Sequence, residues 1–339
     1  MKQTVLLVKT SSLGDLLHLL PALSDARRER PDVAFHWVAE EGFAEVAGWH
    51  PAVTRVIPLA LRRWRRELWS ATRAGEWQQF VRQLRAEPYD QVIDAQGLLK
   101  SACIARLARG RRSGFDRHSA REPWGVWLYQ EPFFVDPAQH ALERLRQLLA
   151  LALGYPRPHS PVEYGLAERF PRQPAAEFEW IFLHGTTWSS KQWPEGHWQE
   201  LARLCTPHGR VLLPWGNDRE RARAERIAQV APERVRVADK GNLTQLAHAL
   251  AAVRAVVAVD TGPAHLAAAL GRPVVGLYGP TDPQRTGTVG VGQHHLQGAC
   301  ARLPCRERVC PLGDPPPCWH ALSPERVWQV LQRVTFSAP

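Results

Sequence analysis

The chain has 339 residues, of which 45% are hydrophobic and 22% charged, so it can form two domains with sizeable cores. Its formal net charge of +10 favours an anionic partner without naming one. No run of 18 uncharged apolar residues and no cleavable leader is readable, so we expect a cytoplasmic protein whose contact with a membrane is peripheral.

Short apolar strands alternate with helical patterns through the first half of the chain. Strands are expected over 4–10, 33–40, 53–59 and 89–97. A long amphipathic stretch covers 61–87, and further helices are expected over 98–110 and 140–154. Strands that are apolar on both sides and separated by helices indicate a parallel sheet covered on both faces.

Five prolines between residues 156 and 174 interrupt this alternation and predict a linker over 156–175. Strands and helices then alternate again, with strands expected over 179–185, 210–216, 234–239, 255–262 and 273–280. We therefore predict an α/β protein of two Rossmann-like, doubly wound parallel-sheet domains that face a central cleft, one over 1–155 and one over 176–339. Ligands in such sheets bind beyond the carboxyl ends of the strands.

Asp15 lies at the first strand-to-helix joint, within "TSSLGD". A dinucleotide site has three glycines at this joint, whereas here Gly14 stands alone beside a carboxylate that repels phosphate. This domain is therefore not expected to bind the nucleotide. A strand-terminal carboxylate can instead take a proton from a hydroxyl nucleophile as a general base. Helix capping explains the same residue in an ordinary protein.

Polar residues follow three expected strands in the second half. Thr186, Thr187 and Lys191, in "HGTTWSSKQWP", offer two hydroxyls and an ammonium of the kind that binds a diphosphate. Lysine occurs at only five positions, so this one is informative; a solvated turn is the alternative. Glu220 follows "LLPWG" and can accept hydrogen bonds from ribose hydroxyls, or merely face the dipole of its own helix.

The segment "VDTGPAH" forms the third strand end. It places Asp260, Thr261 and Gly262 before an Ala-rich helix whose first turn contains His265. The amino terminus of that helix can hold an anion, and the imidazole can donate to the same oxygens. A plain helix cap is the alternative for the aspartate or threonine.

Positive charge in the first half is concentrated in two stretches. Residues 61–73 hold five basic residues and one acidic residue, and residues 100–121 hold seven and one. The first stretch, with Trp64, Trp69 and Trp77, predicts contact with an anionic membrane or an acidic acceptor, against the alternative of a solvated basic helix. Nucleic acid is not expected as a partner, because no nucleic-acid motif accompanies the charge.

The six cysteines divide into two groups. Cys103 and Cys205 fall in helical patterns and are expected in the core. Cys300, Cys305, Cys310 and Cys318 cluster in a segment rich in proline and glycine, where a structural zinc site, packed thiols and an oxidation product remain open readings. None is expected to be catalytic.

Longer motifs resemble a known family. "VKTSSLGDLLHLLPALSDA", "VIDAQGLLKSA", "HGTTWSSKQWP" and "VDTGPAHLAAALGRPVVGLYGPTDP" are similar to the ADP-heptose family of lipopolysaccharide heptosyltransferases, over about residues 4 to 285. The resemblance implies a GT-B fold and an inverting enzyme without a cofactor or catalytic metal. The implied reaction moves L-glycero-D-manno-heptose from its ADP sugar to the Kdo of Kdo2-lipid A, at the cytoplasmic face of the inner membrane.

The resemblance also assigns residues. It makes Asp15 the general base and matches Thr186, Thr187, Lys191, Glu220, Asp260, Thr261, Gly262 and His265 to the donor site. Arg62, Arg63, Arg65 and Arg121 fall where the acidic acceptor approaches, and no residue is assigned to a metal. The cysteine-rich segment is similar to the second heptosyltransferase of the pathway, which keeps a heptose acceptor as an alternative.

Two further readings compete with a transferase. A nicotinamide dehydrogenase shares the doubly wound fold but requires the three-glycine fingerprint that residues 11–15 lack. A non-catalytic protein that binds an anionic glycolipid needs the basic stretches but has no use for Asp15 or Lys191.

Overall fold

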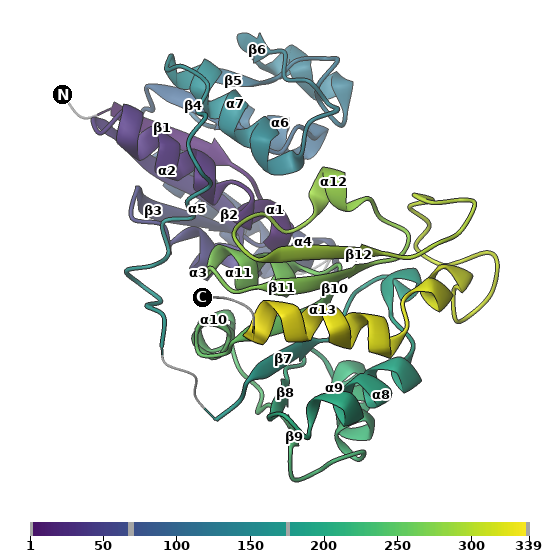
Figure 1. The fold of residues 1–339 in the computed structure, drawn as a ribbon. Helices are drawn as coiled ribbons and strands as arrows, with labels where there is room; N and C mark the ends of the chain where they lie inside the picture. Colours follow the sequence, from purple (N-terminus) through teal and green to yellow (C-terminus); the bar gives the residue numbers. More distant parts are fainter. Residues whose placement is uncertain (1–2, 67–70, 174–176, 337–339) are drawn as a thin grey trace. The chain divides into compact units, whose positions relative to one another are not determined.

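The computed structural model describes residues 3–66, 71–173 and 177–336 (Figure 1). The chain forms two compact units, Met1–Gly165 and Leu166–Pro339. The division falls inside the segment 156–175 that the prolines mark as a linker.

The first unit is built on a parallel sheet. Its six described strands lie in the order β3-β2-β1-β4-β5-β6. Val8 of β1 pairs with Val38 of β2 on one side and with Asp94 of β4 on the other, so β1 lies in the interior of the sheet between two neighbouring strands. The strands are β1 (Gln3–Val8), β2 (Val33–Glu40), β3 (Val53–Leu59), β4 (Gln91–Asp94), β5 (Arg111–Phe115) and β6 (Glu131–Phe133).

Helices and short 3₁₀ turns join these strands. Trp64, Phe80 and Ile104, from α4, α5 and α6, pack on β-strand side chains in one buried cluster, while α2 packs against α7. The helical segments are α1 (Leu13–Leu17), α2 (Leu20–Glu29), η1 (Glu41–Phe43), α3 (Ala44–Ala47), α4 (Leu61–Arg66), α5 (Ala71–Leu84), α6 (Leu99–Leu107), η2 (Pro123–Leu128) and α7 (Ala141–Leu153).

A buried ion pair joins α2 to α7. The Nε of Arg146 lies 2.6 Å from Oδ2 of Asp25, and both side chains are nearly inaccessible. A second guanidinium nitrogen donates to Oδ1 of Asp25, and the same nitrogen donates to the carbonyl of Ser160. The pair is thus hydrogen-bonded in several directions, as a buried charge requires.

The second unit repeats the architecture. Its six described strands lie in the order β12-β11-β10-β7-β8-β9. If the strands are counted within each unit, both sheets have the order 3-2-1-4-5-6. Every described pairing in the sheet is parallel. The strands are β7 (Trp180–Leu183), β8 (Val211–Leu213), β9 (Val235–Val237), β10 (Ala255–Val259), β11 (Val274–Tyr278) and β12 (Gln293–Gln297).

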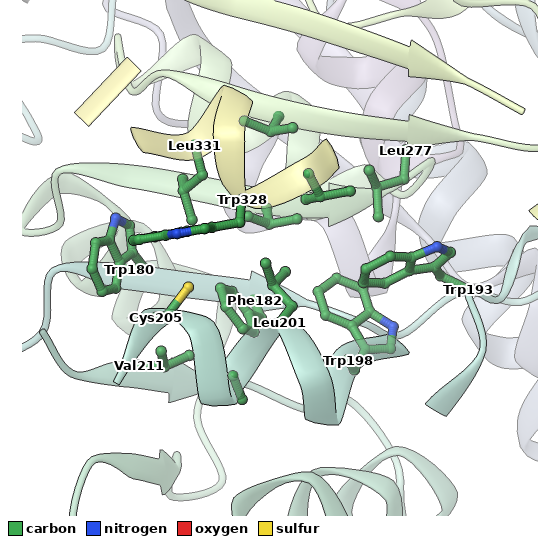
Figure 2. Packing of buried hydrophobic residues seen from close by; sticks show 14 of the residues in the cluster. Trp180, Phe182, Trp193, Trp198, Leu201, Cys205, Val211, Leu277, Trp328 and Leu331 are labelled. Carbon is green, nitrogen blue, oxygen red and sulfur yellow. The ribbon is translucent and has the colours of Figure 1, made fainter. Parts of the chain in front are cut away.

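Tryptophans dominate the core of this unit. Figure 2 shows Trp328 and Leu331 of the last helix on one side of the buried strand residues and Trp198 and Leu201 of α8 near them. Such rings bury large apolar areas, each about 150–250 Å². The helical segments are η3 (Ser189–Lys191), α8 (Glu195–Cys205), α9 (Asp218–Ala228), α10 (Leu243–Ala251), α11 (Gly262–Ala269), α12 (Pro283–Thr286), η4 (Pro317–Ala321) and α13 (Pro324–Phe336).

The predicted α/β fold with two parallel sheets is confirmed, and three strands were missed. β5, β6 and β12 lie in the outer half of their sheets, where partial exposure replaces the apolar runs that signal a buried strand. The amphipathic stretch over 61–87 forms two helices, α4 and α5. Among the described residues, none of the helices has the length and apolar character to cross a membrane.

The expectation for Cys103 was wrong. Its side chain is exposed, whereas Cys205 is buried in the tryptophan-rich core. In α6 the residues Ala102 and Ala105 take the inward positions, so Cys103 points away from the sheet. Helical periodicity alone did not decide which of these small residues faced inward.

A buried histidine makes the first unit sensitive to acid. Nδ1 of His50 accepts a hydrogen bond from the backbone N–H of Ala52, at 3.1 Å, so the neutral ring carries its proton on Nε2, which lies 3.0 Å from the Ser24 hydroxyl. Burial, with a smaller contribution from Arg27, lowers the pKa of His50 from 6.5 to about 4. Protonation in the folded state would break the bond from Ala52.

We therefore expect the free energy of unfolding to fall as the pH drops from about 6.5 towards 4. In this range His50 binds a proton in the unfolded chain but stays neutral in the folded protein. At pH 5 the loss is about 2 kcal/mol from this ring. Urea midpoints at pH 7.5 and pH 5 measure it. The His50→Gln variant should lose less stability on acidification, whereas exposed His159→Gln should behave like the unsubstituted protein. Equal pH dependence in all three proteins would contradict the assignment.

Candidate active site

In each unit some of the candidate residues lie where the order of strands reverses: Asp15 in the first unit, and Lys191 and Asp260 in the second. In the first sheet β1 lies between β2 and β4, so the chain leaves β1 and β4 towards opposite sides. In the second sheet β7 lies between β8 and β10 and creates the same arrangement. Such topological switch points, beyond the carboxyl ends of the strands, are where open α/β sheets bind ligands.

Asp15 follows β1 at the first switch point. It is the third residue of α1, and its Oδ2 accepts hydrogen bonds from the backbone N–H of Ser12, at 2.6 Å, and from the Ser12 hydroxyl, at 2.9 Å. The side chain is half-buried. The sequence allowed either a helix-capping or a catalytic role for Asp15. The hydrogen bond from the Ser12 backbone shows that Asp15 caps the start of α1. The cap also fixes the carboxylate in one orientation, as a general base requires.

The loop after β4 holds the Asp15 loop in place. The side-chain carbonyl of Gln96 accepts from the backbone N–H of Thr10 at 2.7 Å, and its amide donates to the carbonyl of Ser11 at 2.6 Å. Gln96 therefore clamps the two loops of the switch point together. The position of Gln96 soon after a buried strand was the signal available in the sequence. Its role depends on contact with Ser11, which lies 85 residues away in sequence.

Two buried charges support this loop pair. Asp94 accepts from the hydroxyls of Ser101 and Tyr129, at 2.7 and 2.6 Å, and burial raises its pKa. The ammonium of Lys9 donates to the carbonyl of Ala95, and burial lowers its pKa although both Asp15 and Asp94 favour the charge. Lys9 had no predicted role. A lysine inside an apolar strand was the signal that could have identified it.

The structure separates the four arginines expected at the acceptor. Arg62 is exposed, with its guanidinium 5.3 Å from the centre of the Phe43 ring, and Arg65 and Arg121 are also exposed. Arg63 differs, because its guanidinium contacts Glu41 at 3.1 Å and Glu76 at 3.0 Å. Two carboxylates therefore already neutralise Arg63, which weakens it as an anion ligand.

The two described tryptophans near the first basic stretch differ in exposure. Trp64 is buried, and its indole donates to Oε2 of Glu76 at 2.5 Å. Its ring meets that of Trp77 edge to face, 5.8 Å between centroids. Trp69 lies outside the described residues. Trp64 is therefore a core residue, whereas Trp77 is exposed, and the contact of this stretch with a membrane or an acidic acceptor stays a prediction.

The second switch point contains an ion pair. Nζ of Lys191 lies 2.6 Å from Oδ2 of Asp260, and 16% and 9% of the two side chains are exposed. The hydroxyl of Thr281 donates to the same Oδ2 at 2.7 Å. The ammonium also lies 4.4 Å from the centre of the Trp188 ring. Lysine and aspartate, 69 residues apart in sequence, thus meet at the ends of β7 and β10.

The threonines and the following helix complete this edge. The hydroxyl of Thr186 donates to the backbone carbonyl of Asp260 at 3.3 Å, while Thr187 is exposed. Thr261 is the N-cap residue of α11, Gly262 is its first residue, and His265 lies buried in its first turn. The backbone N–H groups of such a turn attract negative charge.

Glu220 lies beside the loop after β7. Its Oε2 accepts from the backbone N–H of Gly216 at 2.7 Å. A Cβ atom on Gly185 would lie 2.5 Å from the Glu220 carboxyl carbon, so this carboxylate lies directly against the loop after β7. The predicted carboxylate is therefore brought to the edge that bears Lys191, and it also lies in the first turn of α9, where the alternative places it at the positive end of the helix dipole.

The four clustered cysteines share one small pocket. Cys300, Cys305, Cys310 and Cys318 all line it, and burial, with smaller effects of the other three thiols, raises the pKa of Cys318 to about 11. Within the described ranges, no group of three or more His, Cys, Asp or Glu side chains is arranged to hold a metal ion, and all six cysteines are free.

Two Rossmann-like units in one chain, each with the strand order of nucleotide-binding sheets, are the architecture of the GT-B fold class. Residues 77–314 match the family model of glycosyltransferase family 9 (heptosyltransferase). The chain belongs to this family and is a glycosyltransferase.

Relatives at high identity agree with this assignment. Lipopolysaccharide heptosyltransferase 1 of Pseudomonas aeruginosa is 48% identical over 98% of both chains. The E. coli heptosyltransferase WaaC with ADP is similar with a TM-score of 0.88 and 42% identity, over 98% of this chain and 100% of that one. The structure of WaaC with ADP-2-deoxy-2-fluoro heptose is similar with a TM-score of 0.86 and 42% identity, over 98% of this chain and 99% of that one.

Proposed function

We propose that the enzyme transfers L-glycero-D-manno-heptose from ADP-L-glycero-D-manno-heptose to the Kdo of Kdo2-lipid A. The observation that carries the donor half is the contact between Lys191 and Asp260 at the second switch point, next to the threonine loop. It is supported by the E. coli relative, whose solved structures are described with ADP and with an ADP-heptose analogue.

A single displacement inverts the sugar carbon. A hydroxyl of the acceptor gives its proton to the carboxylate of Asp15, and its oxygen forms a bond to the anomeric carbon of the heptose. The bond from that carbon to the phosphate oxygen breaks, and its electron pair leaves with ADP. The capped geometry of Asp15 supports the role, because the Ser12 contacts hold the base in one orientation.

The departing diphosphate gains negative charge during the reaction. Lys191, the Thr186 hydroxyl and the N–H groups that open α11 are suited to stabilise this charge. Asp260 holds the ammonium in position and offers acceptors for sugar hydroxyls. Glu220, beside Gly185, offers a carboxylate that can accept hydrogen bonds from the ribose hydroxyls. His265 in the first turn of α11 adds a donor to the same edge.

The acceptor is acidic and anchored in lipid, which suits the exposed guanidinium groups of Arg62, Arg65 and Arg121. A lipid-linked acceptor also requires the enzyme to work at a membrane, so we propose a peripheral enzyme at the cytoplasmic face of the inner membrane. The named P. aeruginosa relative, lipopolysaccharide heptosyltransferase 1, supports the first heptose transfer over the second.

The decisive experiment offers ADP-heptose and either of two acceptors to the purified chain. One is lipid A bearing Kdo alone, and the other bears Kdo and one heptose. Mass spectrometry of the products should show that heptose is added to the first acceptor at least about 10²-fold faster than to the second. Discrimination of this size is expected when the wrong acceptor leaves polar groups of the site without their hydrogen bonds.

A preference for the heptosylated acceptor would replace this function by the second transfer of the pathway. Donor use without either product would contradict both acceptors. The same reactions with excess EDTA test the expected metal independence, because activity that disappears with EDTA and returns with a divalent cation would overturn it.

A further inference from the structure

Two tryptophans of the first unit are exposed to a degree unusual for this residue. Trp124 and Trp127 lie in η2 with 76% and 86% of their surfaces accessible, whereas Trp37, Trp180 and Trp193 are buried. Leu99, at the start of α6, is also exposed, at 44%. We call these three side chains the tryptophan face. An exposed group of large apolar side chains commonly marks an interaction surface.

The backbone prevents both indoles from turning inward. Residues three apart in a 3₁₀ helix project from the same side, so Trp124 and Trp127 point together. The neighbouring side of η2 is occupied by α6, because a Cβ on buried Gly125 would lie 3.1 Å from Cβ of Ala102 and 3.4 Å from Cα of Leu99. That last contact also places Leu99 against η2.

Hydrogen bonds fix the segment at both ends. The carboxylate of Glu122 accepts from the backbone N–H of Leu99 at 2.8 Å, and the N–H of Glu122 donates to the carbonyl of Gly97. At the other end, Tyr129 donates to buried Asp94 at 2.6 Å. The indoles therefore stand on a rigid support, which lowers the entropy lost when they insert into a partner.

The charge around this face is positive. Lys100 follows Leu99 on α6 and lies within electrostatic reach of buried Glu40, and Arg117 and Arg121 lie in the loop that leads into η2. Between residues 100 and 121 the one acidic residue is Asp116, whose Oδ1 is engaged by the N–H groups of His118 and Ser119. The carboxylate of Glu122 accepts a hydrogen bond from the backbone N–H of Leu99. Indole rings beside basic side chains match the interface of an anionic bilayer.

The tryptophan face is connected to the loop of the candidate base. A Cβ on Gly97 would lie 3.6 Å from the backbone nitrogen of Arg121, so these two loops touch. The adjacent Gln96 in turn donates to Ser11, in the loop that carries Asp15. A bilayer at this face therefore lies beside the side of the unit that handles the acceptor.

We propose that the tryptophan face, with Lys100 and Arg117, docks the enzyme on an anionic lipid bilayer. This inference rests on the proposed function for its biological context, because that function assigns a lipid-anchored acceptor. It differs from the surface expected over residues 61–73, where Trp64 is buried and Arg63 is paired with carboxylates.

Vesicle flotation with the full chain tests the docking directly, using phosphatidylglycerol mixed into phosphatidylcholine and phosphatidylcholine alone. The double variant Trp124→Ser/Trp127→Ser should bind the anionic vesicles at least about tenfold more weakly than the unsubstituted chain. Lys100→Gln/Arg117→Gln should weaken binding and reduce its dependence on salt. Val291→Ser/Val309→Ser, which removes two exposed apolar side chains of the second unit, should bind normally.

Unchanged vesicle binding by the tryptophan double variant overturns the proposal, and so does equal binding to neutral vesicles. Sedimentation velocity without lipid adds a further outcome: self-association that the double variant abolishes would make the face a contact between copies of the chain. Thermal melting should show the same Tm for all the variants, since the replaced side chains are exposed.

Activity separates this inference from the proposed function. On a water-soluble, deacylated Kdo acceptor the tryptophan double variant should match the unsubstituted chain. On the acceptor embedded in vesicles its kcat/KM should fall about tenfold or more. If the unsubstituted chain transfers heptose to neither acceptor, the proposed function fails, while vesicle flotation still decides the docking.

Discussion

Replacing Asp15 by asparagine is expected to lower kcat by about 10³-fold, within the range that a general base contributes. Asparagine has nearly the same shape and can still accept from Ser12, so the loop should keep its conformation. It cannot take the proton of the acceptor hydroxyl. The measurement is the rate of heptose transfer at saturating donor and acceptor.

Two comparisons separate this loss from misfolding. The variant should bind ADP as tightly as the unsubstituted enzyme. Asp32→Asn, which changes an exposed aspartate of the same unit, should retain full activity. An Asp15→Asn variant with kcat within about tenfold of the unsubstituted enzyme would remove Asp15 as the base.

Replacing Lys191 by methionine is expected to lower kcat/KM for the ADP sugar by about 10²–10³-fold. Methionine retains an unbranched side chain beside Trp188 and removes the charge. The loss has two causes, since the diphosphate loses a cation and the carboxylate of Asp260 is left without its partner at 2.6 Å. Steady-state kinetics and ADP calorimetry measure the two effects.

The double variant Lys191→Met/Asp260→Asn distinguishes these causes. If unpaired Asp260 repels the diphosphate, the double variant should bind ADP more tightly than Lys191→Met alone, a non-additivity expected of residues in contact. Lys240→Met removes an exposed lysine of the same unit and should change neither kinetics nor binding. Undiminished ADP affinity in Lys191→Met would contradict the diphosphate role.

Much of the site followed from strand ends. Asp15, Lys191, Thr186 and Asp260 were each identified because they come directly after an apolar strand or in the turn that follows it. In a parallel sheet all such ends meet at one edge, so placement along the chain already implied the proximity of Lys191, Thr186 and Asp260 within the second sheet. The structure adds the contacts themselves, among them the 2.6 Å between Lys191 and Asp260.

The partners of other members of the site could not be assigned from local pattern, although a lysine inside an apolar strand is itself unusual. Gln96 acts on a loop 85 residues away, and Lys9 is buried within reach of two carboxylates. The amide and the ammonium have these roles only because β1 and β4 are neighbours in the sheet. The sequence contains both residues but no signal of which distant backbone each one meets.

The sequence by itself determined the two parallel sheets and the edge of each that bears the chemistry, because apolar runs and helical periods are local properties of the chain. The tertiary structure alone decided which charges and rings remain available. Arg63 meets Glu41 and Glu76 only when α4, η1 and α5 are packed together, and this contact neutralises it. Trp64 is buried and Trp127 exposed for the same physical reason: packing between elements distant in sequence selects which side of each helix water reaches.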